Sequence, residues 1–228
     1  MNDLKRWTGL PLVIFGSGGI SREVAFVVEE INESCSAPVF ELFGFVESEN
    51  RIVEEKISGY EVICSDDHFP EFAAGFTQLG VVVPFGTPSL KRRLYEELLS
   101  KCGNLVFPNI IHPSVSIRKG FVKIGVGNVF TYGCRLTTEI NIGNFNLFNL
   151  NSTIGHDVVI GDFCVINPLV AISGGVRIEN DVLIGTGANI LQRIILRERC
   201  TVGAGAVVTK DVSKETVVVG VPAKPLGG

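Results

Sequence analysis

The sequence predicts a two-part chain: a small α/β domain of the Rossmann-like βαβ type, followed by an all-β domain that is a parallel β-helix. Three observations lead to this fold class. Every sixth residue from Ile124 to Val208 is apolar. Before that run, short apolar stretches alternate with amphipathic, helix-like stretches. A Gly-rich turn at residues 16–19 follows the first apolar stretch. We place the domain boundary between residues 1–106 and residues 107–228.

The repeat requires the chain to turn every six residues. Neither an α-helix, with its period of about 3.6, nor a continuous strand of period two produces this pattern. The periodic positions are Ile124, Phe130, Leu136, Ile142, Phe148, Ile154, Ile160, Ile166, Ile172, Ile178, Ile184, Ile190, Leu196, Val202 and Val208. Two residues earlier the side chain is mostly small or apolar: Cys134, Ser152, Val158, Cys164, Val170, Val176, Val182, Ala188, Cys200 and Ala206. Stacked coils with one large and one small inward residue per face explain both sets.

Glycine often follows the periodic residue, and we expect it there because tight corners favour a residue with φ freedom and without a Cβ. These glycines are Gly125, Gly143, Gly155, Gly161, Gly185 and Gly203. The β-helix is expected to run from near Pro108 to near Val212. An extra residue between Ile117 and Ile124 predicts an irregular coil over residues 113–122.

The N-terminal part is expected to form a parallel sheet with intervening helices. The predicted strands are Leu12–Phe15, Val39–Val46, Glu61–Cys64 and Val81–Phe85, and the predicted helices are Glu23–Ile31, a short helix after Asp66, and Ser89–Leu99. The turn before the first helix points backbone N–H groups at a position where a phosphate can bind. Glu47, after the second strand, is a candidate contact to a sugar or base; a tight turn without ligand and a solvated acid are the alternatives.

Composition excludes several classes of protein. The net charge is −4 and the one basic cluster is Lys91-Arg92-Arg93, which argues against a nucleic-acid-binding surface. We expect these three side chains to lie on a solvated helix face. No apolar stretch approaches the ~20 residues of a membrane span, and no signal peptide is apparent, so we expect a cytoplasmic protein. Three of the six cysteines fall on inward repeat positions and are expected to be reduced core thiols.

His156 is the candidate catalytic residue. It lies two positions after periodic Ile154 and is expected to point outward from the coil. Three six-residue segments make one triangular coil, so Gly174, eighteen residues later, is expected directly over it. A base beside an exposed backbone N–H suits acyl transfer, with Asp157 orienting the imidazole. His68 and His112 are expected to be structural or exposed.

Several motifs carry a resemblance to a known family. They are Ile154–Asp162, Ser173-Gly174-Gly175, Gly185–Ala188, Gly203–Val208 and the tail Val219–Pro225. The sequence resembles the left-handed β-helix hexapeptide acyltransferases. With its leading Gly16–Gly19 domain, it is similar to the branch of sugar-nucleotide 4-amino N-acetyltransferases and sialic acid O-acetyltransferase-like proteins.

The resemblance implies a homotrimer in polysaccharide biosynthesis that transfers acetyl from acetyl-CoA to the amine of a UDP-, dTDP- or GDP-linked 4-amino-4,6-dideoxy sugar. It implies no metal. His156 is then the general base, Asp157 its orienting acid and Gly174 the oxyanion donor. Acetyl-CoA contacts are expected at Gly174, Gly175, Gly185, Thr186, Ala188, Gly203, Ala204, Ala206, Val221, Pro222 and Lys224. Substrate contacts are expected at Gly16, Ser17, Gly18, Gly19, Glu47 and Asn149.

This chain departs from the branch at three places. Ile20 stands where the branch often has His, Glu47-Ser48 where it often has two Asp, and Val165 where some members have a second His. The nucleotide and sugar therefore stay open. Three other functions are alternatives: O-acetylation of a sialic acid or another sugar hydroxyl, a non-enzymatic sugar-nucleotide-binding protein, and a zinc hydratase of the β-helix type. The last needs three converging histidines, and the repeat region holds only His112 and His156.

Overall fold

The structure is a computed structural model that describes residues 8–48 and 56–227 of the 228-residue chain. The described residues form two compact units. One consists of the described residues up to Pro84 together with Tyr95–Pro108, and the other of Phe85–Leu94 together with the described residues from Asn109 onward. The predicted boundary at residues 106 and 107 stays a prediction.

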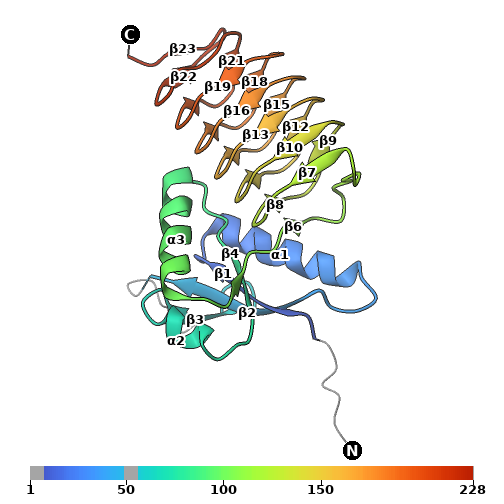
Figure 1. The fold of residues 1–228 in the computed structure, drawn as a ribbon, viewed down its shortest axis with the longest axis vertical. Coiled ribbons are helices and arrows are strands. Elements are labelled where there is room, and N and C mark those ends of the chain that lie inside the picture. Colours follow the sequence, from blue (N-terminus) through green and yellow to red (C-terminus); the bar gives the residue numbers. More distant parts are fainter. Residues whose placement is uncertain (1–7, 49–55, 228) are drawn as a thin grey trace, which may run out of the picture. The chain divides into compact units, whose positions relative to one another are not determined.

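The first unit contains a parallel sheet with the strand order β3-β2-β1-β4-β5 (Figure 1). Its strands are β1 (Leu10–Phe15), β2 (Phe40–Glu47), β3 (Glu61–Ser65), β4 (Leu79–Val82) and β5 (Leu105–Val106). The helices along this part of the chain are α1 (Gly19–Glu33), α2 (Phe69–Ala73) and α3 (Pro88–Lys101). The strand order reverses between β1 and β4, as in doubly wound sheets, where ligands bind at the carboxyl ends of the strands.

The predicted order of strands and helices is confirmed, but β4 begins and ends earlier than the predicted strand Val81–Phe85. Gly80 lies inside β4, although a glycine normally weakens a strand. A Cβ on Gly80 would lie 2.7 Å from a methyl group of Leu12 and 3.0 Å from the Pro11 carbonyl oxygen of β1, so a side chain at this position would crowd the neighbouring strand. The strand stops before Pro84, which has no N–H to donate to a neighbouring strand.

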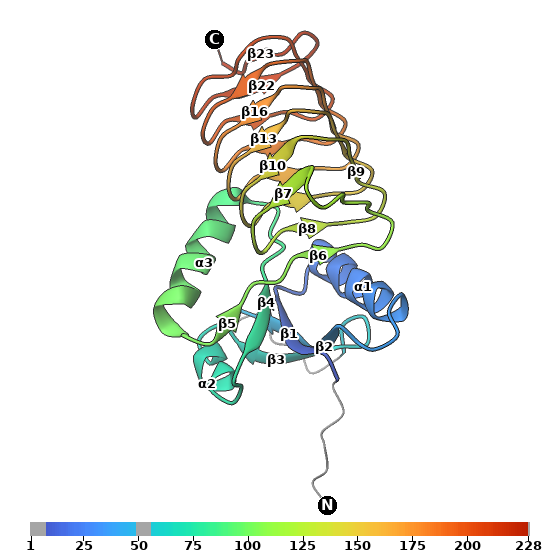
Figure 2. The same ribbon diagram turned by 45° about the vertical axis from the view of Figure 1, so that its right-hand side comes forward.

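The second unit is a parallel β-helix whose coils are stacked one on the next (Figure 2). Face 1 consists of β7 (Val122–Ile124), β10 (Ile140–Ile142), β13 (Val159–Ile160), β16 (Arg177–Ile178) and β19 (Ile195–Leu196). Face 2 consists of β6 (Ile110–Ile111), β8 (Val129–Phe130), β11 (Leu147–Phe148), β14 (Val165–Ile166), β17 (Leu183–Ile184), β20 (Thr201–Val202), β22 (Val217–Val219) and β23 (Lys224–Pro225). Face 3 consists of β9 (Arg135–Leu136), β12 (Thr153–Ile154), β15 (Ala171–Ile172), β18 (Asn189–Ile190) and β21 (Val207–Val208).

From β7 to β21, stacked strands pair with an offset of eighteen residues, as the repeat predicts; Ile154 of β12, for example, pairs with Ile172 of β15. All ten small inward positions are fully buried. Burial of each valine or isoleucine side chain stabilises the fold by roughly 1.5–3 kcal/mol. The stability of the core is therefore the sum of many similar contributions. The predicted irregular coil holds no strand between residues 112 and 121. The predicted end near Val212 is wrong, because Val217 and Val218 of β22 pair with Thr201 and Val202 and extend face 2 by one more coil.

The predicted reason for the corner glycines is half right. From Ile124 to Val202, positive φ occurs three residues after each periodic residue, not one, and non-glycine residues such as Phe145, Asp157 and Arg193 hold most of these positions. The glycines directly after the periodic residue do not have positive φ; they are required by close packing. A Cβ on Gly155 would lie 2.7 Å from the Gly174 nitrogen, and one on Gly185 2.5 Å from the Ala204 nitrogen. The next coil leaves no room for a side chain there.

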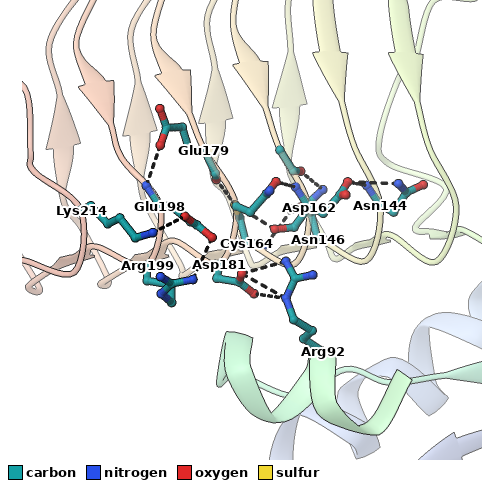
Figure 3. Close-up of polar contacts among 12 residues, drawn as sticks. Arg92, Asn144, Asn146, Asp162, Cys164, Glu179, Asp181, Glu198, Arg199 and Lys214 are labelled. Atoms are coloured by element: carbon teal, nitrogen blue, oxygen red, sulfur yellow. Dashed lines mark hydrogen bonds and ion pairs between the residues drawn. The ribbon is translucent and has the colours of Figure 1, made fainter. Parts of the chain in front are cut away.

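Of the three residues of the basic cluster, Arg93 is exposed as predicted, but Lys91 and Arg92 are not on a solvated helix face. Arg92 forms a two-pronged ion pair with Asp181 (Figure 3), with nitrogen–oxygen distances of 2.7–3.1 Å, and its guanidinium lies 4.3 Å from the centre of the Phe163 ring. Lys91 is 1 % exposed, and its Nζ donates a hydrogen bond to the Phe145 carbonyl. The first turns of α3 are thus fixed to the coils of the second unit.

Lys91 gives the second unit a pH-dependent stability. Burial lowers the pKa of Lys91 from 10.5 to about 7, and the nearby Cys164 and Asp181 only partly oppose this shift. Between about pH 7 and pH 10 the unfolded chain therefore binds a proton that the folded chain does not, so the unfolding free energy rises with pH. In the unaltered protein this dependence amounts to a rise in unfolding free energy of up to about 1.4 kcal/mol per pH unit. We expect Lys91→Met to remove this rise, as measured by denaturant unfolding between pH 7 and pH 9.

The matched control is Lys101→Met at the exposed end of the same helix, where the amine pairs with Glu97. This variant is expected to keep the slope of the unaltered protein. If the unfolding free energies of Lys91→Met and of the unaltered protein changed equally with pH, the buried amine would stay charged between pH 7 and pH 9, and the prediction would be wrong.

Candidate active site

His156 and Asp157 form a hydrogen-bonded pair at the turn after β12. The His156 Nδ1 lies 2.7 Å from a carboxylate oxygen of Asp157, and both side chains are more than half exposed. Asp157 adopts the left-handed turn conformation, with φ of 59°, and its N–H donates to the Thr138 carbonyl of the preceding coil. A carboxylate that accepts the Nδ1 proton fixes the tautomer in which Nε2 is the free base.

Gly174 lies directly against the His156 ring. A Cβ on Gly174 would lie 2.5 Å from both Cε1 and Nε2 of the imidazole, and the neighbouring Gly175 N–H donates to the His156 carbonyl at 2.8 Å. Only glycine at position 174 allows the ring to occupy this place. Within the part of the chain that the structure describes, no acceptor receives the Gly174 N–H. A base and an unused backbone donor therefore lie side by side, as the eighteen-residue spacing predicts.

Gly174 and Gly175 lie beside His156, but the other residues predicted to bind acetyl-CoA lie at a different corner of the coil or in the tail that follows it. We call residues 155–158 and 173–176, which connect face 3 to face 1, the histidine corner. Residues 149–152, 167–170, 185–188 and 203–206, which connect face 2 to face 3, form the glycine corner. The strands of face 3 separate the two corners, so a single chain does not bring His156 together with Gly185, Thr186, Gly203 or Ala204.

Thr186 and Ala204 are exposed at the glycine corner, whereas Ala188 and Ala206 are fully buried and point into the core. These two alanines present no surface to a ligand in this chain. The tail continues the same corner: Val221 is 73 % exposed and follows β22, and Lys224 pairs with Val219 in the antiparallel strand β23. Val221, Pro222 and Lys224 therefore continue the corner that holds the corner glycines.

Asn149 also lies at the glycine corner, where its side-chain oxygen accepts the Leu150 N–H at 2.8 Å and faces the Thr131 hydroxyl at 3.4 Å. It is half-buried and shapes the corner. The structure does not place it beside His156 within one chain.

The turn Gly16–Gly19 lies at the carboxyl end of β1, beside the point where the strand order reverses. Gly16 has φ of 77°, and Gly18 precedes the first residue of α1 without a side-chain cap. No heavy atom lies within 4 Å of a Cβ built on Gly18 or Gly19, so this helix end is open. Glu47 is 5 % exposed and accepts the Ser17 N–H at 2.8 Å. One of its oxygens thus holds the turn in place.

The two other histidines have local partners. The His112 Nδ1 accepts the Ser114 N–H at 2.9 Å and the side chain is buried, and His68 bonds to the Ser65 hydroxyl. Among residues 8–48 and 56–227, no group of three His, Cys, Asp or Glu side chains could hold a metal ion. No helix in these same ranges is long and apolar enough to cross a membrane.

The inward cysteines are poor nucleophiles. Burial raises the pKa of the Cys164 and Cys200 thiols to about 12 and also raises the pKa of Cys134. Since the thiolate is the reactive form, these three side chains stay protonated at neutral pH. An acyl-cysteine intermediate at the repeat therefore has no chemical support.

One feature near the histidine corner escaped the sequence analysis. A cavity of about 310 Å³ is lined by Ser116, Arg118, Phe121, Arg135, Leu136, Thr137 and Thr138. The eighteen-residue spacing places Arg118 under Leu136 and Thr138 under His156 and could have indicated this grouping. The irregular coil, in which the register is broken, hid it.

Two family models match the chain. The PglD N-terminal domain matches residues 11–98, and the bacterial transferase hexapeptide (six repeats) matches residues 175–210. GDP-perosamine N-acetyltransferase of Escherichia coli O157:H7 is 27% identical over 193 residues, which cover 84% of this chain and 82% of that protein.

Two solved structures share the fold over nearly the whole chain. PerB from Caulobacter crescentus, in complex with CoA and GDP-perosamine, has a TM-score of 0.84 at 24% identity and covers 95% of this chain and 97% of its own. The acetyltransferase domain of PglB from Neisseria gonorrhoeae FA1090, in complex with acetyl coenzyme A, has a TM-score of 0.81 at 25% identity and covers 96% and 100%. The predicted fold class, a Rossmann-like domain followed by a left-handed β-helix, is confirmed. The chain is an acyltransferase that combines an N-terminal domain of the PglD type with bacterial transferase hexapeptide repeats.

Proposed function

We propose that the protein transfers an acetyl group from acetyl-CoA to the amine of a nucleotide-linked 4-amino-4,6-dideoxy sugar. The observation that carries this proposal is the grouping of His156, Asp157 and the unused Gly174 N–H at one corner. The relative that covers most of the chain is named for N-acetylation of GDP-perosamine, and this supports the amino-sugar substrate.

The mechanism is direct transfer in a ternary complex. The sugar nitrogen attacks the thioester carbonyl, becomes acidic as the C–N bond forms, and loses its proton to the His156 Nε2. The carbonyl oxygen takes up negative charge, and the Gly174 N–H donates a hydrogen bond to it. Asp157 stabilises the imidazolium that forms. The tetrahedral intermediate then collapses, the C–S bond breaks, and the imidazolium returns its proton to the departing thiolate of CoA.

Acetyl-CoA is proposed to bind between two copies of the chain in a homotrimer. The histidine corner and the glycine corner lie at opposite ends of the face 3 strands, so one copy supplies His156 and its neighbour supplies Gly185, Thr186, Gly203 and Ala204. Three large apolar side chains are exposed along the glycine corner and its continuation towards β8: Tyr132, Leu150 and Leu169. Burial against a second copy would remove this apolar surface from water.

The nucleotide is proposed to bind at the Gly16–Gly19 turn. This turn lies at the carboxyl end of β1, and the open N-terminus of α1 suits a phosphate. Glu47 holds the Ser17 N–H with one oxygen, which orders the turn and leaves its other oxygen as the candidate contact to a sugar hydroxyl.

The test is a substrate screen. UDP-, dTDP- and GDP-linked 4-amino-4,6-dideoxy sugars are incubated with acetyl-CoA while thiol release is followed, and the product is examined for one added acetyl group on nitrogen. The matched controls are the corresponding 4-hydroxy sugars and free sialic acid. Thiol release with an amino sugar alone supports the proposal. Release with sialic acid alone would establish O-acetylation, and release with none would refute transfer to these sugars.

A further inference from the structure

Gly174 and Gly175 leave a gap on the outer side of the histidine corner, and one side chain from each neighbouring coil enters it. A Cβ on Gly174 would lie 2.5 Å from the imidazole of His156, which belongs to the preceding coil. A Cβ on Gly175 would lie 3.3 Å from Cγ of Arg193, which belongs to the following coil. Neighbouring coils are about 4.8 Å apart, so the stem of Arg193 leans back towards the coil of the two glycines.

The backbone conformation alone does not require a glycine at position 175. Gly175 has φ of 71°, but Asp157 and Arg193 hold the equivalent positions of the two neighbouring coils with φ of 59° and 61°. What the second glycine provides is space for the arginine stem, as the first provides space for the imidazole. A base and an arginine therefore approach the Gly174 N–H from opposite sides along the axis of the β-helix.

The Arg193 guanidinium is not engaged by its own chain. Its backbone N–H donates to the Gly174 carbonyl at 3.1 Å, which fixes the residue to the coil of the oxyanion donor. Asp157 is bonded to the imidazole, and Asp211, one coil later, accepts the Ile195 N–H at 2.9 Å. Among the residues that the structure describes, no carboxylate or other acceptor pairs with the Arg193 side chain, which is exposed.

The proposed course of the cofactor brings its sulfur to this arginine. The predicted acetyl-CoA contacts other than Gly174 and Gly175 begin at Gly185 and continue into the tail, so they belong to coils later than that of Gly174. In a trimer whose three β-helices run parallel, acetyl-CoA therefore extends from Gly174 towards later coils. The sulfur joins the acetyl group to the rest of the cofactor, and it then lies between Gly174 and Arg193.

We propose that Arg193 is a further catalytic residue, which contacts the thioester sulfur and stabilises the thiolate of CoA as it departs. This inference rests on the proposed function, because it places the thioester carbonyl at the Gly174 N–H. When the tetrahedral intermediate collapses, the C–S bond breaks and its electron pair stays on sulfur. A guanidinium beside the sulfur offsets this charge until the imidazolium of His156 delivers its proton. Arg193 itself exchanges no proton in this step.

The kinetic test compares Arg193→Met, which keeps an unbranched stem without the charge, with Arg193→Lys, which keeps the charge. The matched control is Arg197→Met on the same coil, where the exposed guanidinium lies 3.5 Å from an exposed carboxylate oxygen of Glu179. We expect Arg193→Met to lower kcat by roughly tenfold to a hundredfold, because the charge on sulfur develops only in the transition state. The KM for acetyl-CoA is expected to stay within about twofold.

Arg193→Lys is expected to lose less kcat than Arg193→Met, and Arg197→Met to keep both kinetic constants. Equal losses in the Met and Lys variants would show that the stem and not the charge matters, which would contradict the proposal. A rise in the KM for acetyl-CoA with kcat unchanged would make Arg193 a binding contact only, and would overturn its catalytic role. Thermal melting verifies that each variant is folded.

Titration of the thiol of bound CoA tests the same contact without an acceptor. The ultraviolet absorbance of the thiolate is followed with pH in the complex, with the free protein as the blank. A nearby cation favours the thiolate, so we expect the pKa of the bound CoA thiol to be about one pH unit lower in the unaltered protein and in Arg197→Met than in Arg193→Met. Equal values in all three would contradict the proposal. If no nucleotide sugar is acetylated, the proposed function fails, but this titration still decides whether Arg193 contacts the sulfur.

Discussion

His156→Ala is expected to lower kcat by at least about two orders of magnitude, because the attacking nitrogen then loses its proton without a positioned base. Binding of acetyl-CoA is expected to be unchanged, since the imidazole is proposed to touch the acceptor amine and not the body of the cofactor. Steady-state kinetics with the best nucleotide sugar, combined with calorimetric titration of acetyl-CoA, measures both effects.

His68→Ala is the matched control, because the His68 side chain is exposed and, within residues 8–48 and 56–227, forms a hydrogen bond only with the nearby Ser65. This variant is expected to have a kcat within about twofold of that of the unaltered protein, because substitutions of exposed side chains away from a site normally have small effects. A His156→Ala variant with nearly normal kcat would remove the imidazole from the mechanism and leave the Gly174 N–H as the remaining catalytic feature of the corner.

Gly174→Ala is expected to be almost as damaging, although it adds one methyl group. The new Cβ would lie 2.5 Å from Cε1 and Nε2 of the imidazole, which is closer than real contacts allow, so the ring must move. A displacement of about 1 Å at a catalytic group can cost about a hundredfold in rate. We therefore expect kcat to fall by about two orders of magnitude in a protein that is still folded.

Gly103→Ala controls for the generic effect of replacing a glycine, because nothing lies within 4 Å of a Cβ there and its φ is not positive. It is expected to keep both activity and melting temperature. If Gly174→Ala retained full activity, the imidazole would have to act from a different position. The placement of His156 directly under Gly174 would then not contribute to catalysis.

The repeat region could be predicted nearly residue by residue because burial dictates each inward position. Cys134, Cys164 and Cys200 were correctly assigned to the core from spacing alone. The conformation of the turns was not predictable in the same way. Phe145, Leu169 and Arg193 adopt positive φ because the coil geometry imposes it, and the local sequence carries no signal for that.

Tertiary contacts account for the other differences. Lys91 and Arg92 look like an exposed helical charge cluster, and only the fold brings Asp181, eighty-nine residues later than Arg92, within reach of an ion pair. The fourth strand was predicted at Val81–Phe85, whereas β4 begins at Leu79 and includes Gly80, which packs against Leu12 and Pro11 of β1. The placement of His156 beside Gly174 was predictable from the sequence because it depends on one fixed spacing. The arginine-lined cavity was not, since it is built across the irregular coil.

His156 of one copy of the chain and the glycine corner of its neighbour are proposed to act together in catalysis. This arrangement is tested by co-expressing two differently tagged inactive variants, His156→Ala and Thr186→Trp, and purifying trimers that carry both tags. Thr186 is exposed at the glycine corner, so a bulky side chain there blocks the cofactor without disturbing the core. In such mixed trimers one interface in three pairs an intact His156 with an intact glycine corner, so we expect about one third of the activity of the unaltered protein. Mixed trimers as inactive as either variant alone would contradict a site shared between subunits.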